Sequence, residues 1–334
     1  MPKKKVTSLV WFRNNLRVID NLSLKKSIEN SDKVIGYVNI DPNIIKTTSY
    51  GFKKTEKFRI KFLLESISDL KKQLDKINIS LIVKNEDFKS SINSVISKYK
   101  IDNIYIQKEW TRDELLEEDI IPSNVNLIKD FDQFLFSPLD VSKVYENIPR
   151  SFSNFRKKCE KLLSIDDILP SPKPLSKTNV INEEYSIPSL SDLGFEEFEV
   201  HKDSAFKFLG GETHGIDRVN EYFFKSKNLS KYKLTRNGLI GKDYSSKISS
   251  WLANGSISVK YVYSQIKTYE DTVEKNDSTY WLLFELIWRD FFKYVSMQHR
   301  EKFFSSNGIY GGHKEWSQDL NLLNSWINGE TDDP

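Results

Sequence analysis

The sequence predicts two kinds of structure in series, an α/β domain built on a parallel sheet and then an all-α domain. Over the first 135 residues, short apolar runs alternate with stretches of helical periodicity. Beyond Phe206 the helical pattern continues with almost no strand-like alternation. Strands that alternate with helices form a mostly parallel, Rossmann-like sheet covered by helices, whereas purely helical periodicity is typical of a helical domain.

Five strands and three helices are expected in the first part. The strand-like runs are residues 8–12, 34–40, 79–83, 103–106 and 126–128. Helical spacing covers residues 55–77, 86–99 and 111–119, and Ile60, Leu63, Ile67 and Leu70 recur on one face of the first of these. The sheet is therefore expected to end near residue 135.

A connector rich in proline is expected between the two parts. Regular periodicity weakens from about Pro138 to Phe198, and Pro170, Pro172 and Pro174 fall close together. Such a composition favours an extended segment. We therefore divide the chain into an α/β domain at 1–135, a linker at 136–205 and a helical domain at 206–334. In the last part, an apolar helix face is formed by Trp281, Phe284, Ile287 and Phe291.

The composition excludes several classes of protein. The single cysteine, Cys159, rules out an internal disulfide framework and any multi-cysteine metal site. The sequence has no glycine-rich nucleotide-binding pattern, and its four histidines lack the spacing of metal ligands, so no metal is expected. No apolar run approaches the roughly 20 residues of a membrane span. We expect a cytoplasmic protein that does not bind membranes.

Positive charge is concentrated in the second half of the chain. The net charge of +3 decides little, but residues 207–260 hold ten Lys or Arg against four acidic residues. A cationic segment could contact the phosphates of a cofactor or of DNA. It could equally be a solvated, lysine-rich surface.

The first motif with chemical meaning is at residues 242–250. It combines the hydroxyls of Ser245, Ser246 and Ser249 with the ammonium of Lys247. Together with unpaired N–H groups at a helix start, these groups can hold a diphosphate. The alternative is that Ser246 merely caps the helix.

The second motif is at residues 279–292. Glu285, Trp288, Arg289 and Phe292 occupy relative positions 0, 3, 4 and 7, which is one face of an α-helix. Polar groups in such an apolar helix need partners if they are buried. The alternative to a functional site is an internal Glu285–Arg289 pair with Trp288 in the core.

These two motifs resemble the flavin-binding core of the photolyase/cryptochrome superfamily, most closely the cryptochrome DASH branch. Three weaker segments match in the same order along the chain. Residues 10–21 resemble the opening of the antenna domain, with Asn15 where aspartate is usual. Residues 148–157 resemble the cryptochrome DASH linker, and residues 208–212 with Arg218 and Tyr222 resemble the entry to the flavin domain.

The resemblance implies two cofactors. FAD would be contacted by Tyr232, Ser245, Ser246, Lys247, Ile248, Ser249, Glu285 and Arg289. An antenna, 5,10-methenyltetrahydrofolate, would be contacted through its pterin by Glu109. The alternative for Glu109 is a surface glutamate that simply follows a strand.

The resemblance also implies a reaction, in which blue light drives an electron from reduced flavin to a cyclobutane pyrimidine dimer in DNA, preferably single-stranded. Trp288 would stack on the dimer, Glu285 would hydrogen-bond its bases, and Trp316 would be the outermost of the tryptophans that carry electrons to the surface. The protein would be a monomer. The alternatives are a non-enzymatic blue-light photoreceptor or DNA-binding flavoprotein, and an inactive truncated remnant.

Whether the chain is an enzyme is left open by its last residues. Gly329, Thr331 and Pro334 match a family motif, whereas Asp332 stands where that motif has a glycine. Family members continue from this motif into further helices that complete the flavin pocket. The helical flavin-binding domain is therefore expected to be incomplete at its C-terminus, with little photolyase activity.

Overall fold

The computed structural model describes residues 5–49, 51–312 and 315–332. Pro334 and the outermost residues of the predicted domain ranges lie outside the described residues. The N-terminal part is a sheet in which every neighbouring pair of strands is parallel. In the spatial order β3-β2-β1-β4-β5, the strands are β3 (Leu81–Lys84), β2 (Lys33–Asn39), β1 (Thr7–Trp11), β4 (Asn103–Gln107) and β5 (Asn126–Asp130). The predicted fold class is confirmed.

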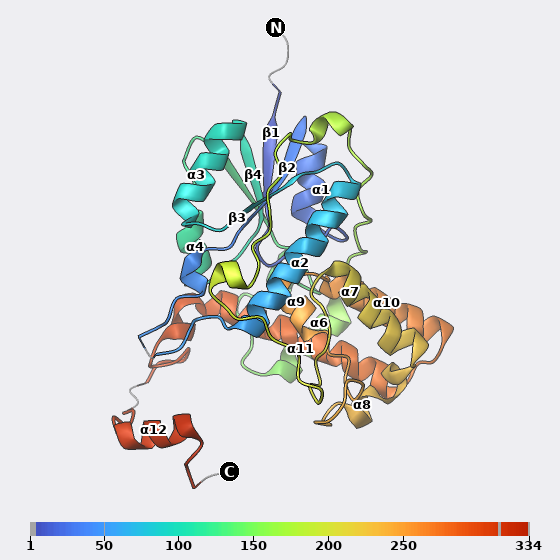
Figure 1. Ribbon diagram of the computed structural model, residues 1–334. Helices are drawn as coiled ribbons and strands as arrows, with labels where there is room; N and C mark the ends of the chain where they lie inside the picture. The colour runs from blue at the N-terminus through green and yellow to red at the C-terminus, as the bar shows by residue number, and fades with distance from the viewer. Residues whose placement is uncertain (1–4, 50, 313–314, 333–334) are drawn as a thin grey trace.

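Helices cover both faces of the sheet (Figure 1). They are α1 (Leu22–Glu29), α2 (Lys57–Lys76) and α3 (Phe88–Tyr99), while α4 (Arg112–Glu118) lies between β4 and β5 in the chain. Val10 of β1 packs in one apolar core with α1 and α2, whereas Leu9 and Trp11 pack in another with α3. Alternation along the strand lets one apolar run fill both cores. The sequence does not predict α1, because Leu24 is the one apolar side chain that this helix buries fully.

The second part is helical. It contains α7 (Glu212–Asn220), α8 (Tyr232–Thr235), α9 (Ser249–Asn254), α10 (Val259–Thr272), α11 (Asp277–His299) and α12 (Leu320–Asn328). A π-helical turn, Glu221–Lys225, extends α7, and 3-10 turns lie at Asn228–Lys231 and Arg300–Phe304. Earlier in the chain, 3-10 turns lie at Pro42–Ile44, Lys177–Asn179 and Ser191–Leu193. No helix in the described ranges is long and apolar enough to cross a membrane.

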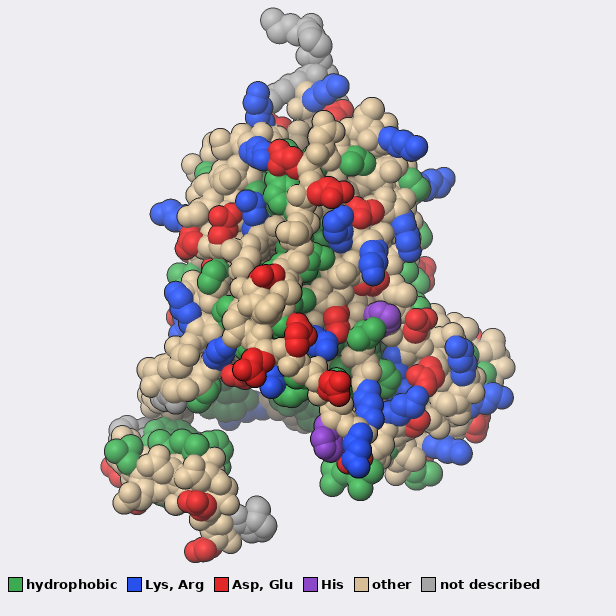
Figure 2. All heavy atoms as spheres, viewed as in Figure 1, with side chains coloured by type: hydrophobic (Ala, Val, Ile, Leu, Met, Phe, Trp, Pro, Cys, Tyr) green, Lys and Arg blue, Asp and Glu red, His purple; other side chains and the backbone are tan. Residues whose placement is uncertain are grey.

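The last helix lies apart from the rest of the chain. In Figure 1, α12 is separated from the other helices, and none of its residues is buried. Figure 2 shows hydrophobic side chains gathered on one side of it. Leu320, Leu322, Trp326 and Ile327 are each more than half exposed.

The expectation of an extended connector is wrong for residues 136–162. This stretch contains α5 (Pro138–Val144) and α6 (Phe152–Leu162). Phe152, Phe155 and Cys159 recur at helical spacing and pack in the same core as α11. The cluster of Pro170, Pro172 and Pro174 lies beyond α6, and residues 163–205 contain no longer element than a single turn. The domain boundaries at residues 135 and 205 stay predictions.

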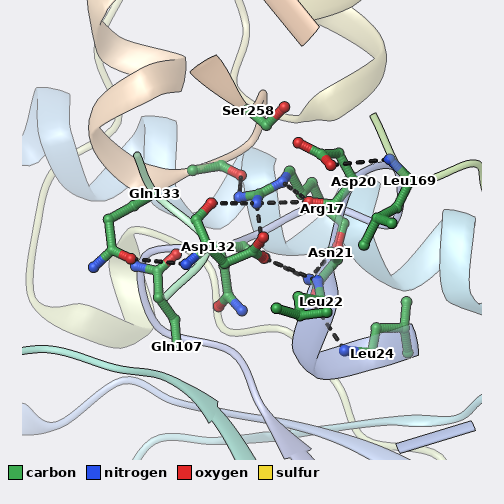
Figure 3. A network of polar contacts seen from close by, with 12 residues as sticks. Arg17, Asp20, Asn21, Leu22, Leu24, Gln107, Asp132, Gln133, Leu169 and Ser258 are labelled. Carbon is green, nitrogen blue, oxygen red and sulfur yellow. Dashed lines mark hydrogen bonds and ion pairs between the residues drawn. The ribbon is translucent and has the colours of Figure 1, made fainter. Parts of the chain in front are cut away.

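A buried guanidinium joins the carboxyl edge of the sheet to the helical part (Figure 3). Arg17, in the loop after β1, is 2% exposed, and its Nη2 lies 2.8 Å from Asp132 Oδ2. Its N–H groups also donate to the backbone carbonyls of Asp20 and Asp132, and to Gly255 O at 3.1 Å. Gly255 lies between α9 and α10. One side chain therefore binds three segments that are far apart in the sequence.

A close backbone contact completes this junction. Gly255 has a φ of 70°, and a Cβ added there would overlap the carbonyl oxygen of Asn14. Beside it, Leu16 N–H donates to Asn254 O at 3.3 Å. Only glycine combines this φ with so close an approach of two backbones.

Replacing Gly255 by alanine should lower the free energy of unfolding by ~3 kcal/mol or more, because the methyl group is strained at positive φ and pressed into the Asn14 backbone. Gly194→Ala is the matched control. Gly194 has a φ of 76°, but nothing lies within 4 Å of its added Cβ, so only a strain of about 1–2 kcal/mol remains. Urea unfolding measures both variants. Equal losses would show that the close contact contributes nothing.

Candidate functional site

One face of α11 carries polar residues that the sequence predicts for a site. Glu285 accepts a hydrogen bond from Arg236 Nη1 at 2.5 Å, and the two side chains are 30% and 32% exposed. The alternative pairing of Glu285 with Arg289 is wrong, because Arg236 reaches Glu285 from the end of α8. Arg289 donates instead to Gln133 O at 2.7 Å and to Leu252 O at 3.4 Å.

Tyr232, at the start of α8, belongs to the same cluster and is 7% exposed. Burial raises the pKa of its phenol; the Glu285 carboxylate raises this pKa further and Arg236 lowers it. The structure thus brings Tyr232, Arg236 and Glu285 together. Sequence reasoning missed Arg236. The sequence pattern that could have indicated Arg236 is its position four residues after Tyr232, because this spacing places both residues on one face of a short helix.

Trp288 packs inside an aromatic cluster. The ring of Phe152, from α6, stacks on it with 3.6 Å between ring centroids and 11° between the planes. Phe292 stacks on it at 5.3 Å, and Phe284 and Phe291 meet it edge-on. These rings therefore cover part of the indole surface of Trp288. This packing is what the alternative interpretation, with Trp288 as a core residue, predicts.

Arg218, on α7, shapes the loop at residues 242–247. Its side chain is buried, and Nε donates to Ser246 O at 2.9 Å. Nη2 donates to Lys242 O at 2.9 Å and to Ser245 O at 3.1 Å, and Nη1 lies 3.1 Å from Asp243 Oδ1. The loop is wrapped around the guanidinium, which uses its donors on the loop itself.

Peptide N–H groups of this loop consequently point away from Arg218. In a trans peptide, the C=O of one residue is antiparallel to the N–H of the next, so the N–H groups of Ser246 and Lys247 face outward. Neither donates a hydrogen bond to another described residue. Lys247 has a left-handed φ of 61°. Outward N–H groups around a left-handed residue form a concavity that binds anions.

The helix after this loop begins later than the sequence suggests. α9 starts at Ser249, and Ile248 occupies its N-cap position without a side-chain cap. The interpretation of Ser246 as the N-cap is therefore wrong, because Arg218 holds its carbonyl within the loop. Ser246 and Ile248 are buried, whereas Ser249 is exposed. The first-turn N–H groups of α9 and the Ser249 hydroxyl add donors next to the outward-facing loop.

Glu109 lies at a second location, the carboxyl edge of the sheet. It follows β4, and Asn14 follows the neighbouring strand β1; Asn14 Nδ2 lies 3.5 Å from Glu109 Oε1. The chain leaves these two strands in opposite directions, which is where ligands bind in open α/β sheets. Glu109 is 8% exposed and accepts from Gln107 Nε2 at 2.7 Å. The alternative of a surface glutamate is wrong, because α11 covers this edge.

Lys293 of α11 is a neighbour of Glu109 that sequence reasoning missed. Burial raises the pKa of Glu109, and the Lys293 ammonium opposes this rise. Burial lowers the pKa of Lys293 to about 8. Its Nζ lies 5.3 Å from the ring centroid of Trp110. Lys293 follows Arg289 by one helical turn, and this spacing is the sequence pattern that could have indicated Lys293.

Trp316 lies outside the buried aromatic core. Its side chain is 60% exposed, and Nε1 donates to Ser306 O at 3.3 Å.

Asp290 is a fully buried carboxylate of α11, which carries Glu285 and also covers the edge of the sheet at Glu109. Its Oδ2 accepts from the N–H groups of Leu135 and Phe136 at 2.7 and 2.9 Å, and Oδ1 lies 3.6 Å from Arg289 Nη1. Burial raises the pKa of Asp290 to about 7, although Arg289 and the two N–H groups lower it. Sequence reasoning missed Asp290, because its burial depends on segments far away in the chain.

Asp290 should make the stability of the fold depend on pH. Between its ordinary pKa near 4 and its folded value, the folded chain retains a proton that the unfolded chain has released. The stability contributed by this group is therefore present below about pH 4 and is lost as the pH rises through about 7. Asp290→Asn keeps one oxygen for the two N–H groups and cannot ionise. Urea unfolding from pH 5 to 8 should give a smaller fall in stability for the variant; an unchanged fall would contradict this role.

Comparison with known proteins places this geometry in a family. A family model described as DNA photolyase matches residues 8–175. The chain is 37% identical over 333 residues to a cryptochrome DASH of Gloeobacter violaceus, covering 98% of this chain and 66% of that protein. It is 33% identical to the chloroplastic/mitochondrial cryptochrome DASH of Solanum lycopersicum, covering 99% and 61%.

A solved cryptochrome from Synechocystis has the same fold, with a TM-score of 0.89 and 32% identity, covering 98% of this chain and 69% of that one. The chain spans 61–66% of the length of the two cryptochrome DASH proteins above. Its matches run over nearly all of its own residues, through both the sheet and the helices that carry the site. The chain belongs to the photolyase/cryptochrome superfamily, in its cryptochrome DASH branch.

Proposed function

We propose that this chain binds FAD and, under blue light, repairs cyclobutane pyrimidine dimers in DNA. The observation that carries the proposal is the loop at residues 242–247, whose carbonyl groups turn to Arg218 while the N–H groups of Ser246 and Lys247 point outward. A diphosphate is held by such donors beside a cation and a helix start. Bound FAD would supply light absorption and transferable electrons.

The other predicted FAD contacts come from segments that adjoin this loop. Ser245 and Ile248 belong to the loop and its exit, and Ser249 starts α9. Arg289 reaches α9 through Leu252 O, and Glu285 adjoins Tyr232 through Arg236. These contacts support one cofactor site between α8, α9 and α11.

The Arg236–Glu285 pair is proposed as the place where the dimer binds. It is partly exposed and offers a carboxylate for the N–H groups of the bases beside a guanidinium for a phosphate. Trp288, one turn along α11, would supply the stacking surface. Single-stranded DNA is the proposed substrate, because a dimer outside a duplex need not be unpaired first.

A folate antenna is proposed at the junction of β1 and β4. The buried carboxylate of Glu109 would accept from the N–H groups of the pterin in 5,10-methenyltetrahydrofolate. Asn14, Trp110 and the Lys293 ammonium surround it with polar and aromatic groups. Buried titratable groups at a ligand position of this fold type support the proposal.

One observation favours a second function, a light-sensing or DNA-binding flavoprotein without repair. Phe152 stacks on Trp288 at the distance and angle that a base would adopt. If Phe152 stays in place, a dimer has less indole surface to bind.

Reconstitution with FAD distinguishes these functions. The chain would be loaded with FAD, and the flavin would be reduced with dithionite in the absence of oxygen. It would then be mixed with a single-stranded oligonucleotide containing one thymine dimer and illuminated with blue light. Loss of the dimer, followed by chromatography of the digested oligonucleotide, supports repair. FAD retention without loss of the dimer supports the second function, and failure to retain FAD contradicts both.

A charge at Ser249 should weaken FAD binding without harming the fold. Ser249→Asp adds a carboxylate beside the proposed diphosphate, although an acidic residue in the first turn stabilises a helix. Ser249→Asn introduces a side chain of nearly the same size as aspartate but without a charge, so it is the matched control. We expect the aspartate variant to bind FAD at least about tenfold more weakly, or ~1.4 kcal/mol, than the asparagine variant in fluorescence titrations. Equal affinities would remove Ser249 from the phosphate site.

Trp288→Leu separates stacking from packing. Leucine keeps an apolar side chain in the aromatic cluster but cannot stack on a base. Binding of dimer-containing single-stranded DNA to the FAD-loaded chain should weaken by ~1–3 kcal/mol in fluorescence anisotropy. The same DNA without the dimer is the control ligand and should lose less. Unchanged binding of the dimer, or equal loss for both DNAs, would leave Trp288 as a core residue.

A further inference from the structure

The outer edge of β3 is unpaired near its carboxyl end. β3 is the outermost strand of the described sheet, and β2 is its one neighbour there. On the side of β2, Ser80 O and Lys84 O accept from the N–H groups of Gly36 and Ile40 at 2.9 and 2.8 Å. Backbone groups of successive residues in a strand point to opposite sides. The N–H and C=O groups of Val83 therefore face away from β2.

These outward groups of Val83 are covered but have no partner. Val83 is 5% exposed, and its N–H and C=O groups form no hydrogen bond with any residue in the described ranges. The N–H group of Asn85, just beyond the strand, likewise donates to none of the residues described. Roughly 90% or more of buried backbone groups in proteins are paired. Unpaired groups at a sheet edge are where a further strand can bind.

A cavity lies against this edge. Its volume is about 640 Å³, within the range of roughly 300–1,000 Å³ that is typical of ligand pockets. One wall is formed by residues 83–86, and the other by the linker at residues 184–188 together with Asp192. The linker contacts the start of the strand, where Ile181 N–H donates to Ser80 Oγ at 3.1 Å. Beyond this contact, the cavity separates the linker from the edge of β3.

Carboxylates dominate the charged groups of the cavity. Glu86, Glu184 and Asp192 line it, with Lys84 as the one cation of the lining. Lys84 Nζ lies 3.1 Å from Glu86 Oε1, so these two charges balance each other. Hydrogen bonds from Ser189 hold the pKa of the Asp192 carboxyl below its ordinary value, which keeps it ionised at neutral pH. The two remaining negative charges favour a cationic ligand.

Apolar groups complete the linker wall. Tyr185, Ile187 and Pro188 lie in the same wall as two of the carboxylates. Tyr185 is held in place, because its hydroxyl lies 2.8 Å from the hydroxyl of Tyr99 on α3. Side chains of a strand alternate between two faces, so a bound strand could present basic side chains to the carboxylates and apolar ones to this surface. Because the linker stands beyond the edge, the cavity admits one extended chain rather than the sheet of a second copy.

We propose that the edge of β3 binds an extended, basic segment of a partner protein, which adds to the sheet as a further strand. The N–H and C=O groups of Val83 would pair with the backbone of that segment. Glu184 and Asp192 would bind its Lys or Arg side chains. Backbone hydrogen bonds would supply affinity, and the carboxylates would supply selectivity. This inference is independent of the proposed function, because no residue assigned to FAD, DNA or folate lines the cavity.

The test uses the full chain and a fluorescein-labelled peptide, Lys-Val-Lys-Val-Lys, with Glu-Val-Glu-Val-Glu as the control peptide. Fluorescence anisotropy should show binding of the basic peptide and not of the acidic one. Val83→Pro removes an outward N–H group, which edge strands tolerate, and should weaken binding at least about tenfold. Asn85→Pro should have the same effect at an exposed position. Asn85→Ala is its matched control, since it keeps the N–H group, and should bind within about twofold of the wild type.

Hydrogen exchange locates the bound peptide, and the amides of residues 81–86 should exchange more slowly in its presence. Glu184 is exposed and pairs with no other described residue, so Glu184→Gln should leave the fold unchanged and weaken binding by roughly threefold at low salt. Circular dichroism checks the fold of each variant; if Val83→Pro unfolds, Asn85→Pro decides.

Three results would overturn the proposal. The first is a wild type that does not bind the basic peptide at about 1 mM, or that binds both peptides equally. The second is binding that the folded proline variants retain, or protection of a segment other than residues 81–86. The third is dimerisation that the proline variants lose, without peptide binding, which would assign the edge of β3 to a second copy of this chain.

Discussion

The buried guanidinium of Arg17 is the contact on which the arrangement of both candidate sites depends. It ties the loops after β1 and β5 to the turn at Gly255, with Asp132 as its charged partner. Removing one member of a buried ion pair costs about 3–5 kcal/mol, because the other charge stays buried without compensation. Since α9 and α10 adjoin this turn, the orientation of the loop at residues 242–247 relative to the sheet follows from the same contact.

The two candidate sites meet at this junction through one glutamine. Gln133 O accepts from Arg289, a predicted FAD contact, while Gln133 Nε2 donates to Lys108 O at 2.9 Å and lies 3.5 Å from Glu109 Oε2. The edge of the sheet and α11 are thus opposite sides of one polar layer. Burial raises the pKa of Asp132 within this layer to about 6. Such perturbed groups are unfavourable for folding and are concentrated where sites are built.

The sequence predicts what depends on short-range periodicity and misses what depends on contacts between segments. All five strands appear within two residues of their expected bounds, because apolar runs between helices are a local pattern. The spacing of Glu285 and Arg289 permits a pair, but Arg236 from another helix binds Glu285 instead. Ser246 has the composition of a cap, yet Arg218 holds its carbonyl in the loop. No local spacing encodes these competing partners.

Arg218 shows why a buried cation can be retained despite the unfavourable loss of its hydration. Its donors hold three loop carbonyls, and Asp243 and Glu221 balance its charge. Turning the carbonyls inward is what turns the N–H groups of Ser246 and Lys247 outward. The proposed cofactor site therefore depends on this one side chain, so an anion at Lys247 would favour the loop conformation that Arg218 already holds.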